Sequence, residues 1–298
     1  MSNIRNEAVQ IESHRLYLKS LAEREQYSAY QRSDYLANEW QEKLLRKNRS
    51  SLECTARCSP QSVMSSQNAQ SGISTIWRER ICEWQYGVVD RFDIEREVVF
   101  YSTYYLDQYL SVCYVDEKLF QLVAMTCFYL AIKLHSPKKL GIQCIASMGR
   151  GVIHEDHIAA MELSIMQNLD WYLHPPTPLA FIRNIFPLIS DKHEAQEFCQ
   201  FLSELSVCAY PFVYTKPSSI AIAAILIAID RFQLGNETRV SCRELLEELE
   251  LDIYAPDVSQ CCNLLTRIYR LAAPELESSN CCDTNISAHD SFIGITNE

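Results

Sequence analysis

An uninterrupted apolar stretch near the middle of the chain most constrains its fold. Residues 118–135 read KLFQLVAMTCFYLAIKLH and contain neither glycine nor proline. Leucine, methionine and alanine favour a helix, and the apolar residues recur at steps of three and four. The predicted helix is apolar on almost every side, so other helices must surround it. We expect Asp116 to cap its start, where a carboxylate meets the positive end of the helix dipole.

Helical segments flank this stretch in two sets of five. The first set covers residues 73–91, 94–112, 118–135, 139–148 and 155–169; the second covers 177–188, 195–208, 218–232, a short helix after Ser241, and 256–271. In each set the third helix is very apolar and the fourth is short, which indicates a duplicated architecture. Strand-like alternation is almost absent and glycines number only seven. The sequence therefore predicts an all-α fold with two tandem five-helix domains and an N-terminal helical extension.

Proline and capping signals set the boundaries between these segments. Pro175-Pro176 separates the two sets, because proline disfavours a helix at and before its position. Thr177-Pro178 is a predicted helix start, and Asp191 to Glu194 and Ser241 to Glu244 match capping boxes. The expected organisation is an N-terminal helical extension with a flexible linker (1–72), two domains (73–176 and 177–273) and a disordered acidic tail (274–298). Aromatic residues in the extension indicate that part of it docks on a larger body; these are Tyr27, Tyr30, Tyr35 and Trp40.

Charge and composition exclude several classes of partner. The net charge is −11, and residues 151–298 carry 8 basic against 21 acidic residues, or −13. Such a surface repels phosphate backbones, so we expect no nucleic-acid partner. The longest apolar run, 218–229, is shorter than the roughly 20 residues that span a bilayer, so we expect no membrane partner. The N-terminus has no apolar export signal. Most of the 13 cysteines lie in apolar helical patterns, as thiols do in a reducing compartment.

No catalytic motif is present. The sequence contains no glycine-rich phosphate loop, no nucleophile elbow and no paired metal-ligand spacing. His154 and His157 lie at a predicted helix start, where the dipole accounts for the acidic residues between them, so we expect no metal site. Two charges remain within apolar helices, Lys133 and Glu162. Either they are unrelated solvated side chains, or the two helices pack side by side and the charges form a partner site.

Several segments, taken in order, resemble the cyclin family. They are Trp77-Arg78 through Trp84, Tyr105-Leu106-Asp107-Gln108-Tyr109-Leu110-Ser111, Leu119-Phe120-Gln121-Leu122, Leu130-Ala131-Ile132-Lys133, Met161-Glu162, Leu169-Asp170-Trp171 and Pro176-Thr177-Pro178. Pro217-Ser218-Ser219 in the second set is also cyclin-like, and Met161-Glu162-Leu163 resembles the D-type group. The resemblance covers most of the chain from Trp77 to Leu271 and rests on the order and spacing of the segments.

The resemblance implies a regulatory subunit that binds and activates a cyclin-dependent serine/threonine protein kinase. Such a subunit controls cell-cycle progression from the nucleus or the cytoplasm, is not itself an enzyme, and needs no cofactor. In the family, the residues at the positions of Lys133 and Glu162 form the core of the kinase contact. Those matching Leu134, Met166 and Trp171 add apolar surface.

The family's substrate-docking patch corresponds to Trp77, Ile81, Trp84 and Gln121, and it is degenerate here. Trp77 replaces the usual methionine, an arginine at position 80 replaces an apolar residue, and a glycine at position 87 replaces an acidic one. The last two changes disfavour a cationic peptide, so we predict weak docking of the basic-x-leucine motif of kinase substrates or inhibitors.

Two other interpretations stay open. Transcription factors that bind nucleic acid also carry paired cyclin boxes, although the acidic second half disfavours that role. The chain could instead be a non-kinase adaptor that retains the cyclin fold, because a fold alone does not fix function.

Overall fold

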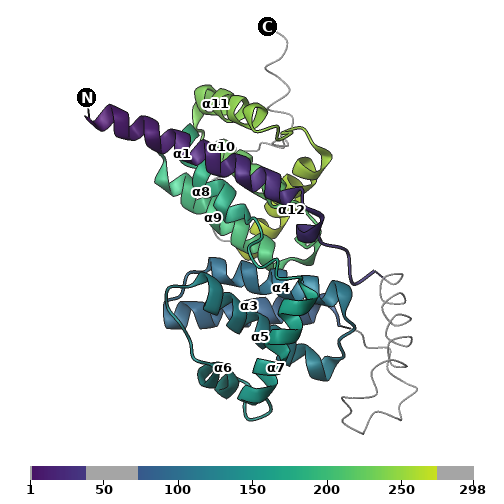
Figure 1. Cartoon of the computed structure of the whole chain (residues 1–298). Helices are drawn as coiled ribbons and strands as arrows, with labels where there is room; N and C mark the ends of the chain where they lie inside the picture. The colour runs from purple at the N-terminus through teal and green to yellow at the C-terminus, as the bar shows by residue number, and fades with distance from the viewer. Residues whose placement is uncertain (1, 38–72, 274–298) are drawn as a thin grey trace. The chain divides into compact units, whose positions relative to one another are not determined.

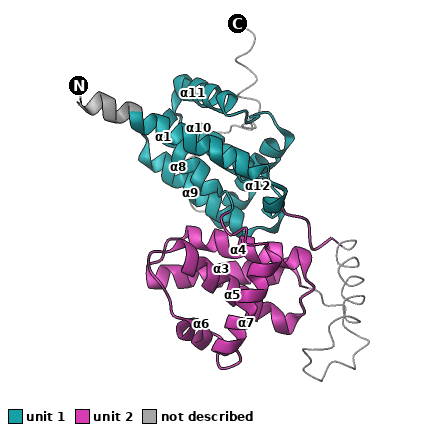
Figure 2. Ribbon diagram, in the orientation of Figure 1, with its two compact units in different colours: residues 1–31, 175–298 teal, residues 32–174 magenta. Residues whose placement is uncertain are grey.

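The computed structural model describes residues 2–37 and 73–273, with side chains from residue 9 onward. All regular secondary structure assigned in these ranges is helical, as predicted. None of these helices is long and apolar enough to cross a membrane. The chain divides into two compact units: unit 1 comprises residues 1–31 and 175–298, and unit 2 comprises residues 32–174 (Figure 2). The expected linker and C-terminal tail lie outside the described residues.

Unit 2 is built around helix α5 (Glu117–His135), which contains the uninterrupted apolar stretch 118–135. Ten of its residues are buried, and it packs against α4 (Glu97–Val112), α6 (Ile142–Met148) and α7 (Glu155–Asn168) (Figure 1). Helix α3 (Thr75–Phe92) joins this core through α4 and through aromatic contacts with α5. The carboxylate of Asp116 accepts a hydrogen bond from the backbone N–H of Leu119 at 2.8 Å, which confirms the predicted cap.

A buried carboxylate, Asp107 of α4, ties several parts of unit 2 together. The guanidinium of Arg78 donates two hydrogen bonds to it, each 2.9 Å long. The Tyr35 hydroxyl donates a third at 2.9 Å, and a nitrogen of Arg32 lies 3.9 Å from the second carboxylate oxygen. Burial lowers the pKa of Arg32, and Asp107 opposes that shift. The segment before residue 38 is thereby anchored to unit 2, as expected for Tyr35; Trp40 lies outside the described residues.

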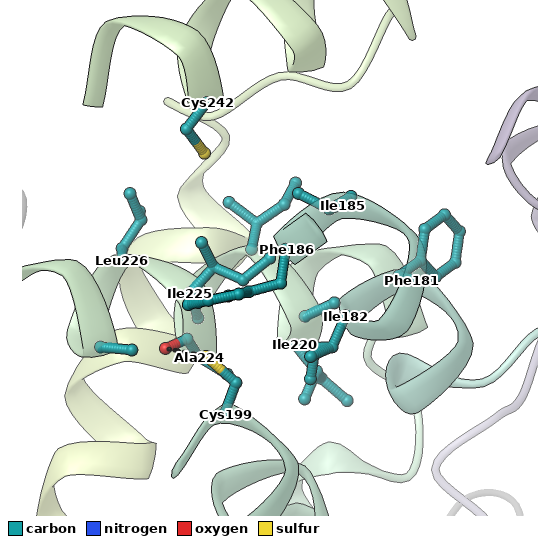
Figure 3. Packing of buried hydrophobic residues seen from close by; sticks show 14 of the residues in the cluster. Phe181, Ile182, Ile185, Phe186, Cys199, Ile220, Ala224, Ile225, Leu226 and Cys242 are labelled. Carbon is teal, nitrogen blue, oxygen red and sulfur yellow. Dashed lines mark hydrogen bonds between the residues drawn. The ribbon is translucent and has the colours of Figure 1, made fainter. Parts of the chain in front are cut away.

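Unit 1 repeats the five-helix arrangement around an equally buried third helix. That helix is α10 (Pro217–Arg231), and around it lie α8 (Pro178–Ile189), α9 (His193–Cys208), α11 (Gly235–Glu248) and α12 (Pro256–Ala272). Side chains from α8 to α11 meet in the core shown in Figure 3; they include Phe181, Ile182, Ile185, Phe186, Cys199, Ile220, Ala224, Ile225, Leu226 and Cys242. Burial raises the pKa of the Cys242 thiol to about 12, so this cysteine packs as a small apolar residue.

Helix α1 (Ser2–Glu25) packs onto unit 1, against α8 and α10 (Figure 1). Leu18 and Leu21 are completely buried there. The buried carboxylate of Glu25 accepts hydrogen bonds from the backbone N–H of Ser218 at 2.7 Å and from its hydroxyl at 2.5 Å. Because Ser218 lies in the first turn of α10, Glu25 satisfies a donor that the helix itself leaves unpaired.

The predicted capping signals were only partly right. The hydroxyl of Thr177 accepts a hydrogen bond from Ala180 N–H at 2.9 Å and begins α8, as expected. The two predicted capping boxes are wrong, because α9 begins after Lys192 without a side-chain cap and Ser241 lies inside α11. Both motifs match the pattern, but α9 begins at His193 and α11 at Gly235.

Candidate partner-binding site

The last turn of α5 and the adjacent face of α7 bring the two predicted charges together. Lys133 Nζ lies 2.9 Å from Glu162 Oε1. The Lys133 side chain is 50% exposed, whereas that of Glu162 is only 12% exposed. The hydrogen bond that Lys133 donates to Glu162 raises the pKa of Lys133, and the Tyr129 ring lies 5.7 Å from the ammonium. The interpretation of two unrelated solvated side chains is therefore wrong.

The two side chains of this ion pair differ in their exposure to solvent, and this difference suits partner binding. An ammonium has three N–H donors, and Glu162 takes one of them. The carboxylate is largely withdrawn from water, so it fixes the position of the lysine while half of the lysine side chain remains on the surface. A partner carboxylate or carbonyl oxygen could bind there without first ordering a flexible side chain, which lowers the entropic cost of association.

Several apolar side chains near the pair in the sequence are exposed or half-buried. Leu134 is 38% exposed and Trp171 is 61% exposed, while Met166 is half-buried. Leu163 and Tyr172, which the sequence analysis did not select, are also exposed, at 49% and 45%. Exposed large apolar residues near a fixed charge are typical of an interaction surface rather than of a solvated face.

The backbone at the end of α7 presents Trp171 in a strained conformation. Asp170 and Trp171 have φ values of 48° and 64°, in the left-handed region that favours glycine. Trp171 N–H donates to the carbonyl of Met166 at 3.1 Å, a bond of the kind that closes a helix C-terminus. Strain of this kind is retained where the surrounding structure requires the conformation, and here it holds an indole in solvent.

A network that the sequence did not reveal holds the end of α5 in place. The Tyr105 hydroxyl donates to the carbonyl of Leu173 at 2.6 Å and lies 2.6 Å from His135 Nε2. The Tyr101 ring stacks on His135 with centroids 3.6 Å apart. Burial lowers the pKa of His135 to about 4, and the neighbouring His174 adds to the shift. Tyr105 belongs to one of the segments that resemble the cyclin family, but nothing in that pattern predicts these contacts.

The predicted substrate-docking patch lies on α3 and the start of α5. The Trp77 ring meets Phe120 edge-on with centroids 6.0 Å apart and is 39% exposed, and Trp84 meets Phe128 in the same way at 5.5 Å. Ile81 is half-buried and Gln121 is exposed. The patch residues thus share one region, with the indoles partly fixed by the core.

The two departures from the family pattern are also at the surface. Arg80 is exposed, and at Gly87 an added Cβ would meet no atom within 4 Å. Position 87 therefore has room for the Cβ of a larger residue.

The two histidines at the start of α7 have a structural explanation. The backbone N–H of His154 donates to Nδ1 of His157 at 3.5 Å, and the ring centroids are 5.3 Å apart. Across residues 2–37 and 73–273, no group of three or more histidine, cysteine and acidic side chains could hold a metal ion.

Comparison with known proteins identifies the family. Residues 23–174 match the model described as cyclin, N-terminal domain, and residues 176–290 match cyclin, C-terminal domain. The chain belongs to the cyclin family. The first match alone covers just over half of the chain, and the second begins next to the boundary between units 2 and 1.

Curated relatives include several kinds of cyclin. The G2/mitotic-specific cyclin S13-6 of Glycine max is 28% identical over 57% of this chain and 38% of its own length. The G1/S-specific cyclin-D1 of Xenopus laevis is 29% identical over 57% of this chain and 60% of its own length. Cyclin-A3-3 of Arabidopsis thaliana is 25% identical over 68% of this chain and 62% of its own. The chain therefore spans less than two thirds of each of these relatives, and the D-type likeness stays weak.

Solved structures show the same fold at low identity. A viral cyclin from herpesvirus saimiri aligns with a TM-score of 0.55 and 15% identity, covering 68% of this chain and 90% of that one. A chain of the yeast RNA Pol II CTD kinase CTDK-1 complex aligns with a TM-score of 0.52 and 12% identity, covering 74% of each.

Proposed function

We propose that this cyclin is the regulatory subunit that binds and activates a cyclin-dependent serine/threonine protein kinase and so controls cell-cycle progression. The observation that carries the proposal is the Lys133–Glu162 pair, a half-exposed ammonium fixed by a nearly buried carboxylate. Its further support is that Leu134, Met166 and Trp171, which lie near the pair in the sequence, are exposed or half-buried. In this proposal the pair forms the polar centre of the kinase contact and the apolar residues add buried area.

The proposed mechanism requires no catalytic residue in the chain. A protein kinase is active when the glutamate of its C helix pairs with its strand lysine and its activation loop is ordered. A partner stabilises that state only if it binds the active arrangement more tightly than the inactive one. Unit 2 suits this task because α5 and α7 present the ion pair on packed helices rather than on a loop. The chain itself would then be a regulator rather than an enzyme.

Charge reversal tests the proposal. We would capture tagged wild type, Lys133→Glu and Glu162→Lys from a native extract and assay protein-kinase activity on the beads. Each reversal is expected to abolish kinase capture, because disrupting a desolvated charge contact costs about 2–5 kcal/mol. Lys118→Glu, an exposed change at the other end of α5, is the matched control and should capture kinase like wild type. Circular dichroism would establish that all variants are folded.

A double variant separates an internal role of the pair from a role in binding. Lys133→Glu combined with Glu162→Lys restores opposite charges within the chain but places them in exchanged positions. If the ammonium itself contacts the kinase, this variant remains folded and still fails to capture activity. If wild type captures no kinase activity, a non-kinase adaptor becomes the better interpretation.

We further propose that the substrate-docking patch binds cationic peptides weakly. Arg80 repels a basic peptide, and Gly87 supplies no opposing acid. A peptide with the basic-x-leucine motif should therefore bind wild type more weakly than a Gly87→Glu, Arg80→Leu variant, as measured by isothermal titration calorimetry. Nanomolar binding to wild type would contradict this prediction.

The site of action in this proposal is the nucleus or the cytoplasm. Its support is the set of buried cysteines in unit 1, which include Cys199, Cys242 and Cys261. Small apolar thiols of this kind are typical of proteins in reducing compartments. Localisation of a fluorescent fusion, compared with a compartment marker, would test it.

A further inference from the structure

The loop after α5 contains a sequence motif that the proposed function does not use. Residues 136–139 read Ser-Pro-Lys-Lys. Proline-directed protein kinases phosphorylate a serine or threonine that precedes proline, and many of them favour a basic residue three positions after the acceptor. The chain has two other such dipeptides, at Ser59 and Thr177, but neither is followed by a basic residue at that position.

We propose that Ser136 is a phosphorylation site for a proline-directed serine/threonine kinase, and that its phosphate loosens the last turn of α5 and weakens binding at the Lys133–Glu162 pair. The first part stands on the motif and the loop geometry alone. The second part rests on the proposed function of that surface.

Ser136 lies where α5 ends, and its backbone and side chain both help to end it. Its N–H donates to the carbonyl of Ile132 at 3.2 Å, and its hydroxyl accepts from the backbone N–H of Lys138 at 3.1 Å. Pro137 then prevents the helix from continuing. The hydroxyl oxygen of Ser136, to which the phosphate would be attached, is therefore part of the turn that ends α5. It lies only three positions after Lys133.

Two lysines after Ser136 hold the loop through their side chains. The ammonium of Lys139 donates to the carbonyl of Lys133 at 2.8 Å, to that of Ile132 at 3.4 Å, and to that of Ser136. Lys139 thus offsets the negative end of the α5 dipole by binding carbonyl oxygens of the last turn. Lys138 forms an ion pair with the carboxylate of Asp93.

A phosphate at Ser136 would compete for both lysines. The γ-phosphorus of ATP forms a bond to the serine oxygen, its bond to the bridging oxygen of ADP breaks, and the serine proton is released. The product carries close to two negative charges and three acceptor oxygens. These charges lie at the negative end of the helix dipole, which is unfavourable, and Lys138 and Lys139 are the nearest following cations in the chain. Drawing Lys139 away removes its bond to the carbonyl of Lys133.

Access to the serine requires the loop to open, and its contacts permit this. Ser136 is only 3% exposed in the folded chain. Residues 137–140, however, take part in no backbone–backbone hydrogen bond of the described structure, and Pro137, Lys138 and Lys139 are exposed. A segment held mainly by surface side chains opens at a lower free energy than the helices around it. Phosphorylation would then trap the opened loop.

The test begins with purified full-length chain, a proline-directed kinase and ATP. Mass spectrometry should find phosphate on Ser136 of wild type, and more of it on Asp93→Asn, which releases Lys138 from its ion pair and leaves the Ser-Pro-Lys-Lys motif intact. Hydrogen exchange of residues 131–141 should become faster after phosphorylation. Ser136→Ala should take up no phosphate in this segment. If neither wild type nor Asp93→Asn is labelled at Ser136, the proposal is overturned.

A second measurement tests whether phosphorylation of Ser136 weakens the capture of kinase activity. Phosphorylated wild type should capture kinase activity from extract about tenfold less than unphosphorylated wild type, the loss expected when one or two charge-assisted contacts at an interface disappear. Ser136→Ala, treated in the same way, should keep its capture. Equal capture by phosphorylated and unphosphorylated wild type overturns the regulatory part. If unphosphorylated wild type captures no kinase, the proposed function fails, whereas the labelling and exchange results still decide whether Ser136 is a modification site.

Discussion

At the scale of single residues, Asp107 shows how a buried charge organises unit 2. Its carboxylate receives hydrogen bonds from Arg78 and Tyr35 and lies close to Arg32, so residues from two other parts of the chain converge on it. The side chain has no exposed surface. A buried carboxylate with this many donors is stable only while its partners remain in place.

Asp107→Ala is therefore expected to destabilise the protein by about 3–5 kcal/mol, because it leaves the Arg78 guanidinium buried without its counter-charge. Urea unfolding followed by circular dichroism would measure the change. Asp90→Ala removes an exposed carboxylate that pairs with Arg96 and should leave the unfolding midpoint almost unchanged. Equal stability of the two variants would contradict the role given to Asp107.

His135 makes stability depend on pH. Its pKa is lowered from 6.5 to about 4, chiefly by burial. The unfolded chain therefore takes up a proton near pH 6.5, whereas the folded chain does so only near pH 4. The stability that neutral His135 contributes is present above pH 6.5 and is lost as the pH falls through this window. The difference in unfolding free energy between wild type and His135→Gln should shrink from pH 7 to pH 4.5; a constant difference would contradict the assignment.

At the scale of the elements, α1 is held by contacts that no local pattern predicts. Glu25 caps α10 through Ser218, a residue 193 positions away, so the sequence around α10 contains no sign of its own cap. Helix α1 also pairs its Arg15 with Glu248 of α11 at 2.6 Å. An element that appeared from its composition to be a charged extension is thus part of the packing of unit 1.

Glu25→Ala should destabilise unit 1 by about 2 kcal/mol, because the N–H of Ser218 loses a buried, charged acceptor at a helix N-terminus. Glu23→Ala, an exposed change on the same helix, is the matched control. Thermal unfolding would compare the two variants. Faster proteolysis within α1 for Glu25→Ala alone would show that the cap also holds the helix in place.

The helices themselves could be predicted because they depend on local patterns. The α5 stretch and the caps at Asp116 and Thr177 follow from composition and spacing, which the structure confirms. The incorrectly predicted capping boxes, such as that at Ser241, show that a local pattern does not always locate a helix start. The same four residues also occur inside a helix. The contact between Lys133 and Glu162 required knowing that α5 and α7 pack together, and the family resemblance supplied that expectation before the structure did.

At the scale of the whole molecule, two five-helix units repeat one arrangement while their surfaces differ. Unit 2 has a fixed charge pair and exposed apolar residues on α5, on α7 and just after it, whereas unit 1 covers part of its surface with α1. A duplicated fold with one specialised surface is consistent with a regulator that binds a partner chiefly through unit 2. The kinase-regulator proposal therefore depends on what binds there and on what that binding changes.

Reconstitution with the purified catalytic subunit of the captured kinase tests most directly whether the surface around Lys133 activates a kinase. Its activity on a peptide would be measured alone, with wild-type chain, with Lys133→Glu and with Lys118→Glu. The account predicts little activity alone, strong stimulation by wild type and Lys118→Glu, and no stimulation by Lys133→Glu at equal concentration. A kinase that is fully active alone, or that responds equally to Lys133→Glu and wild type, would contradict the claim that this surface activates a kinase.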